Sequence, residues 1–166
     1  KDLAGVLKGH REVVHPEVYL RNTGAATEAD AALTKAAREA VSGGGSALDQ
    51  AHALSHAVAE AIAYRPGVTH AHTTAAEAFA QGEGVCQDHA QALIAMARAV
   101  GLPARYVPGY LFADASGAAH EAAHAWAEVY VNGGLGWVGF DPANRCCPDA
   151  RYIRLGSGYD ARDAAP

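Results

Sequence analysis

The chain has 166 residues and carries 13 Lys and Arg against 18 Asp and Glu, a formal net charge of −5. This length fits one domain with one core, and the scattered basic residues argue against a nucleic-acid-binding surface. No apolar run reaches the roughly 20 residues of a membrane span, no signal-peptide pattern opens the chain, and three cysteines cannot form a closed disulfide set, so we expect a cytoplasmic protein without membrane partners.

Residues 1–20 have too few apolar side chains to form a core of their own. They contain two short β-like pieces, at residues 12–14 and 18–20. We interpret this stretch as the end of a β-rich N-terminal region that precedes the chain, and we place the catalytic domain at residues 21–166.

Helix starts are marked by Ser and Thr side chains that are followed by acidic residues, and helix ends are marked by glycines. The sequence predicts three such helices, which run from Thr27 to residues 43–45, from Ser46 to residues 64–67, and from Thr74 to Gly82. A fourth helix starts at Cys86 and places Ala90, Leu93, Ile94, Ala97 and Val100 on one side before Gly101 ends it.

After the fourth helix the apolar period changes to two, which is typical of strands. Strands are predicted at residues 104–112, 124–131 and 135–140, and a possible edge strand at residues 152–155. The Asn132-Gly133 pair between two of them is a hairpin signal. Helices followed by antiparallel strands indicate an α+β fold in which N-terminal helices pack on an antiparallel sheet.

Cys86 falls in the first turn of its predicted helix. Unpaired backbone N–H groups and the helix dipole favour the negative thiolate there. The preceding Gly84 lets the chain turn sharply and leaves N–H groups free near the sulfur for an oxyanion. Taken alone, a cysteine at this position is more often a small buried residue.

His124 begins one predicted strand, and Asp141 ends the next, directly before Pro142. The hairpin between the strands brings the two side chains together. A carboxylate that accepts from one ring nitrogen fixes the tautomer and leaves the other nitrogen to pair with a cysteine.

Four motifs strengthen this interpretation: GVCQD at residues 84–88, RAVGLPARYVPGY at 98–110, HAWAEV at 124–129, and GWVGFDP at 136–142. In order, content and spacing they resemble the bacterial transglutaminase-like superfamily over about residues 45–160. The resemblance implies a papain-like core with a Cys-His-Asp triad, which falls on Cys86, His124 and Asp141.

The resemblance also implies an enzyme that cleaves an amide or peptide bond of a protein or peptide substrate through a thioester, without a cofactor. Hydrolysis and acyl transfer to an amine, as in a protein-glutamine acyltransferase, both remain open, and we favour hydrolysis. Tyr64 and Gln81 are candidate side-chain donors to the oxyanion, and Trp126 is a candidate for contact with the substrate.

Two alternatives come from different classes of protein. Residues 120–124 read His120-Glu121-Ala122-Ala123-His124, which fits the H-E-x-x-H motif of zinc hydrolases, but that chemistry needs a helix, whereas the residues from His124 onwards alternate as a strand. The chain could also be a binding module without catalysis. Cys146 and Cys147 stand where the family has a loop without cysteine, and we expect them to be incidental.

Overall fold

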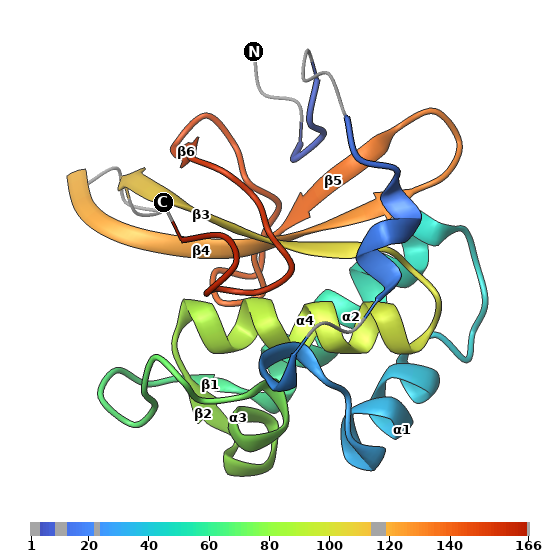
Figure 1. The fold of residues 1–166 in the computed structure, drawn as a ribbon, viewed down its shortest axis with the longest axis horizontal. Coiled ribbons are helices and arrows are strands. Elements are labelled where there is room, and N and C mark those ends of the chain that lie inside the picture. Colours follow the sequence, from blue (N-terminus) through green and yellow to red (C-terminus); the bar gives the residue numbers. More distant parts are fainter. Residues whose placement is uncertain (1–3, 9–12, 22–23, 114–118, 166) are drawn as a thin grey trace.

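The computed structural model describes residues 4–8, 13–21, 24–113 and 119–165. Within these ranges the helices come first and the large antiparallel sheet follows, which confirms the predicted α+β class (Figure 1). None of the helices found there is both long enough and apolar enough to cross a bilayer.

The N-terminal segment differs from the expected β-like pieces. Residues 18–20 belong to a 3-10 helix, η1 (Pro16–Leu20), because a proline with its fixed φ opens that helix. The other expected piece, 12–14, lies partly outside the described residues, and its described part forms no strand. The N-terminal segment instead pairs with the sheet earlier in the chain, where Val6 forms an antiparallel bridge with Val138.

Four α-helices follow a second short 3-10 helix, η2 (Ala25–Thr27): α1 (Ala31–Ala40), α2 (Ala47–Ala61), α3 (Ala75–Gln81) and α4 (Cys86–Ala99). The predicted caps of α2 and α3 are confirmed as capping boxes. Ser46 exchanges hydrogen bonds with Asp49, and Thr74 exchanges them with Glu77.

The predicted cap of α1 is wrong. Thr27 is buried four residues before the first residue of α1, and its hydroxyl accepts a hydrogen bond from Arg98 at 2.8 Å. Asp30 caps α1 instead, because its carboxylate accepts from the Leu33 N–H at 2.8 Å. The hydrogen bond from Arg98 thus engages the Thr27 hydroxyl, which the local sequence pattern predicted as the cap of α1.

The large sheet has the strand order β5-β4-β3-β6 and is antiparallel throughout. Its strands are β3 (Ala104–Ala113), β4 (Ala119–Val131), β5 (Gly136–Phe140) and β6 (Tyr152–Arg154). β4 begins five residues before the predicted start. A second, parallel pair of two-residue strands, β1 (Ala63–Tyr64) and β2 (Glu83–Gly84), was not predicted.

The inner face of the large sheet packs on α4. Alternate residues of β4, Ala125, Ala127, Val129 and Val131, are buried in the same core as Leu93, Ile94 and Met96 of α4. α4 also contacts α1, α2 and α3, so it is surrounded by protein along most of its length (Figure 1). Its many alanines allow this close approach, and the burial fixes the position of its first turn.

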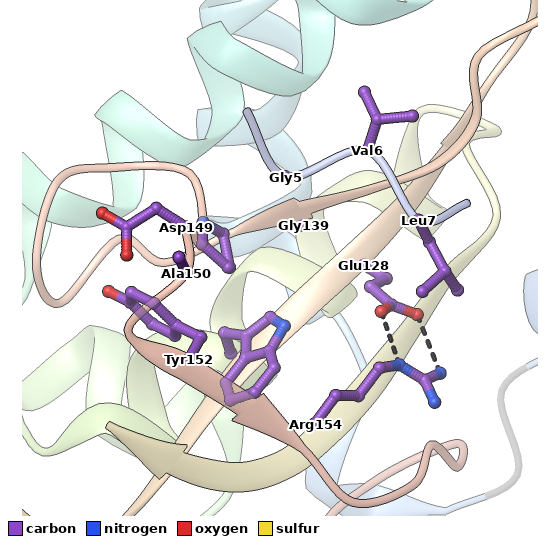
Figure 2. Close-up of a pocket in the computed structure, with 11 residues that line it drawn as sticks. Gly5, Val6, Leu7, Glu128, Gly139, Asp149, Ala150, Tyr152 and Arg154 are labelled. Carbon is purple, nitrogen blue, oxygen red and sulfur yellow. Dashed lines mark hydrogen bonds and ion pairs between the residues drawn. The ribbon is translucent and has the colours of Figure 1, made fainter. Parts of the chain in front are cut away.

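The outer face of the same sheet carries polar residues in place of a second helical layer. The buried Glu128 carboxylate accepts from Arg105 at 2.7 Å and from Arg154 at 2.8 Å. Figure 2 shows this pairing with Arg154 beneath the N-terminal segment at Val6. The buried carboxylate is therefore compensated by two guanidinium groups inside the fold.

Candidate active site

Cys86 is the first residue of α4, directly after β2. Asp88 holds this turn, because its carboxylate accepts from the Val85 N–H at 2.8 Å and from the Thr69 hydroxyl at 2.6 Å. A Cβ on Gly84 would lie 2.7 Å from that carboxylate, so the turn requires glycine there. The half-buried sulfur thus sits where the N–H groups of the first helical turn have no intrahelical partner.

His124 and Asp141 come together as the hairpin predicted. The ring Nε2 of His124 lies 2.7 Å from a carboxylate oxygen of Asp141, and the side chains are 9% and 1% exposed. Cys86 lies close enough to His124 for its side chain to raise the pKa of that histidine. Because Nε2 faces Asp141, the other ring nitrogen, Nδ1, is the one left for the sulfur.

The environment of His124 favours its charged form. Burial alone would lower the pKa of His124, but the hydrogen bonds and charges of Asp141 and Cys86 raise it from 6.5 to about 9. The protonated ring is then the main form at neutral pH, beside a sulfur that gains from a positive neighbour.

Asp141 accepts from two further side chains that the sequence did not point to. The Asn144 amide and the Tyr152 hydroxyl donate to the oxygen that also faces His124, at 2.7 and 2.8 Å. Burial raises the pKa of Asp141, but the bonds from His124, Asn144 and Tyr152 outweigh it and leave the pKa below its ordinary value. The carboxylate is therefore held as an anion.

Asn144 and Tyr152 differ in how far sequence could have revealed them. Asn144 follows Asp141 by three residues in a turn, and its N–H also donates to the Asp141 carboxylate at 3.2 Å, a local pattern typical of Asx turns. Tyr152 reaches Asp141 only because β6 pairs with β3, so no local signal exists. The Tyr152 hydroxyl also lies 3.2 Å from the Cys146 sulfur, and burial raises the pKa of that thiol.

The two candidate oxyanion donors separate in the structure. Tyr64 ends β1 opposite Gly84, which is two residues before Cys86, and partial burial together with the charges of Cys86 and Asp141 raises its pKa. Gln81 is directed to the loop that precedes α3, where its amide donates to the Val68 carbonyl at 3.2 Å. Tyr64 is thus the better placed of the two.

Trp126 is 3% exposed and lies behind His124, with ring centroids 6.3 Å apart. Its ring also meets Tyr152 edge to face at 5.4 Å. Both side chains line a cavity of about 200 Å³ on the outer face of the sheet, where Figure 2 shows Tyr152 opposite Glu128 and Arg154. These contacts describe a packing residue that supports the ring of His124.

His89 is a further residue that the sequence did not single out. Its ring nitrogens lie 2.8 Å from the carbonyl oxygens of Val85 and Ile62. It therefore ties the turn before Cys86 to the end of α2, from which β1 and Tyr64 follow. Only a buried position on α4, three residues after the cysteine, distinguishes it in sequence.

The structure does not contain the helix that the H-E-x-x-H alternative requires at residues 120–124. Residues 120–124 lie in the strand β4, whereas the zinc motif requires its two histidines one turn apart on a helix. Within the described residues, no group of three or more His, Cys, Asp or Glu side chains could hold a metal ion. His52 and His56 share a cavity with Cys146 and Cys147, and His52 packs edge to face on Phe140.

Known proteins share both the sequence and the fold. An uncharacterised protein of Mycobacterium tuberculosis is 42% identical over 81 residues, which are 44% of this chain and 26% of that protein. A candidate cysteine protease from Cytophaga hutchinsonii has 30% identity and a TM-score of 0.76, covering 89% of this chain and 48% of the other. The periplasmic domain of TgpA from Pseudomonas aeruginosa has 26% identity and a TM-score of 0.57, covering 80% of this chain and 49% of the other.

The chain thus spans about a quarter of the mycobacterial relative and about half of each of these solved structures. Their transglutaminase-like, papain-like fold confirms the fold expected from the four motifs. The transglutaminase-like superfamily matches residues 34–142, well over half of the chain. By fold and by sequence, this chain belongs to the transglutaminase-like superfamily.

Proposed function

We propose that the chain is a cysteine hydrolase or peptidase that cleaves an amide or peptide bond of a protein or peptide substrate. The observation that carries the proposal is the hydrogen bond of 2.7 Å between His124 and Asp141, together with Cys86 in the first turn of α4, close enough to raise the pKa of His124. Membership of the superfamily and the likeness to a candidate cysteine protease support it.

In this mechanism the Cys86 thiolate attacks the carbonyl carbon of the substrate and forms a new carbon–sulfur bond. The protonated His124 gives its proton to the leaving amine, and a thioester remains. Water then attacks the thioester while His124 takes a proton from it, which releases the acid and restores the thiolate. Asp141 keeps Nδ1 of the ring directed at the sulfur and stabilises the imidazolium.

The negative oxygen that forms at each attack needs donors. The first-turn N–H groups of α4 have no intrahelical partner, and Tyr64 lies opposite Gly84, two residues before Cys86, so we assign both to the oxyanion. Gln81 is left out of this set because its amide is engaged by Val68.

Hydrolysis is favoured over transfer to an amine. Asp88 and Asp141, the two carboxylates that flank Cys86 in the described structure, both accept hydrogen bonds inside the protein. Neither is presented to a substrate amine that it could attract. A lysine that accepts the acyl group would therefore have to be bound through atoms other than its amine.

Alkylation by iodoacetamide at about pH 6 tests the proposal, because protonated His124 keeps Cys86 reactive there. Cys146 and Cys147 are internal controls, since all three thiols are half-buried and differ in their neighbours. We expect mass spectrometry of the tryptic peptides to find Cys86 modified first. Equal rates for all three thiols would refute the proposed mechanism.

A further inference from the structure

Four large apolar side chains are exposed close to one another on β3 and the β6 segment. They are Tyr110 at 44%, Phe112 at 60%, Ile153 at 49% and Leu155 at 53% exposure, and we refer to them as the apolar patch. Tyr110 lies directly opposite Ile153 in the register, and the Leu155 N–H donates to the Pro108 carbonyl at 3.1 Å. Because alternate residues of a strand share a face, Tyr110, Ile153 and Leu155 lie on the same side of the sheet.

This side is the inner face, the one on which Cys86 lies. Tyr106 belongs to the same row of β3, is 5% exposed and packs in the core with Cys86. Burial and the charge of Cys86 both raise the pKa of Tyr106. Gly109, the neighbour of Tyr110 on β3, lies opposite His124 in the register, so the far end of this row is beside the candidate site. Further along this row Pro108 is half-buried and Tyr110 is exposed, so the side chains become more exposed to solvent with distance from Cys86.

The loss of cover has a simple cause in the arrangement of the elements. In Figure 1, β3 and β4 run on past the end of α4 at which Cys86 lies, so the helix does not cover the last part of the sheet. At about 3.3 Å per residue, Tyr110 is about 13 Å from Tyr106 along the strand, a distance that about four residues of an extended peptide span.

The charged side chains next to the apolar patch are paired with one another. Arg151 bonds Asp149 at 2.6 Å, and Arg154 bonds Glu128 at 2.8 Å on the outer face. The patch itself therefore offers apolar and aromatic surface, with the Tyr110 hydroxyl as its one polar group.

Resting on the thiol chemistry proposed above, we propose that the apolar patch binds an apolar side chain of the substrate polypeptide, within about four residues of the bond that Cys86 attacks. The occupant is the substrate because the patch continues the face that leads from the sulfur, at a distance that an extended peptide reaches. This assigns substrates with large apolar residues near the scissile bond, and places the specificity of the enzyme on β3 and β6.

This inference can be tested without knowledge of the natural substrate by reagents that alkylate Cys86. The reagents differ only in the dipeptide amide, here called the arm, that is attached to the reactive iodoacetyl group. We would compare iodoacetyl-leucyl-phenylalaninamide with iodoacetyl-seryl-glutaminamide, both uncharged, by the second-order rate of Cys86 alkylation. One apolar group changes discrimination by about 10–200-fold, and for this half-exposed surface we expect about tenfold in favour of the apolar arm.

The variant Tyr110→Ser combined with Ile153→Ser should remove most of that ratio. Leu135→Ser is the matched control, because Leu135 is 38% exposed in the turn between β4 and β5, at the other end of the sheet (Figure 1), and it should keep the ratio. The ratio between the two arms corrects for any general change in the reactivity of Cys86.

An equal rate for both arms in the unmodified protein, or a preference that survives in the double variant, overturns the inference. A protein that is dimeric and becomes monomeric in the double variant overturns it as well, since a second copy then covers the patch. If iodoacetamide itself modifies Cys86 no faster than Cys146, the proposed thiol chemistry fails, and this outcome is separate from the other two.

Discussion

Replacing Asp141 by Asn should make the stability of the protein depend differently on pH. In the folded protein the pKa of His124 is raised from 6.5 to about 9 by Asp141 and Cys86 against the effect of burial. With about 1.4 kcal/mol for each tenfold change, this corresponds to about 3 kcal/mol, of which Asp141 supplies the larger part. Both side chains are at least nine-tenths buried, so solvent screens little of it.

The sign follows from linkage. Because the folded pKa lies above the ordinary one, the protonated ring stabilises the fold fully below pH 6.5, and this contribution is lost as the pH rises through about 9. The gap in unfolding free energy between the unmodified protein and Asp141→Asn should therefore shrink by about 2–3 kcal/mol between about pH 6 and about pH 10. Any packing that is lost in Asp141→Asn lowers the unfolding free energy equally at both pH values.

Urea denaturation at the two pH values measures the gap. Asp149→Asn is the matched control, because Asp149 bonds Arg151 at 2.6 Å and neither group titrates in this window, so its gap should stay constant. A gap for Asp141→Asn that is equal at both pH values would refute the reasoning that Asp141 holds His124 in its charged form.

Two further substitutions test the surroundings of Cys86 and Asp141. Tyr152→Phe removes a donor to the Asp141 carboxylate at 2.8 Å, and we expect it to lower the unfolding free energy by about 1.5–3 kcal/mol in urea at neutral pH; an unchanged value would mean that the hydroxyl does not support the carboxylate. Gly84→Ala places a Cβ 2.7 Å from Asp88, so it should cost about 1–3 kcal/mol and slow the alkylation of Cys86, whereas Gly156→Ala, which meets nothing within 4 Å, should do neither.

Much of the site could be predicted because it rests on short-range rules. A hairpin with a known turn fixes which residues lie opposite each other, so His124 and Asp141 could be paired from their positions at the strand ends. The capping box at Ser46 needs only residues three apart, and the structure contains it. Such features depend on few residues and are little affected by the rest of the fold.

The features that were missed depend on contacts between distant parts of the chain. Thr27 matches the pattern of a cap, but Arg98, which lies 71 residues away, occupies its hydroxyl. Tyr152 reaches Asp141 only through the pairing of β6 with β3. The two-residue strands β1 and β2 are too short to produce a period that a sequence pattern could reveal.

The parallel pair β1 and β2 has a consequence for how this protein could be altered. Between Tyr64 and Gly84 the chain makes an excursion of one loop and α3, and the pair closes that excursion at its base, with the Arg65 N–H bonded to the Gly84 carbonyl at 2.8 Å. The exposed tip of this loop at Pro66 and Gly67 can therefore be lengthened at small entropic cost, while Thr69 keeps its hydrogen bond to Asp88 at 2.6 Å. Residues inserted at the tip would present new surface near Cys86 without displacing it.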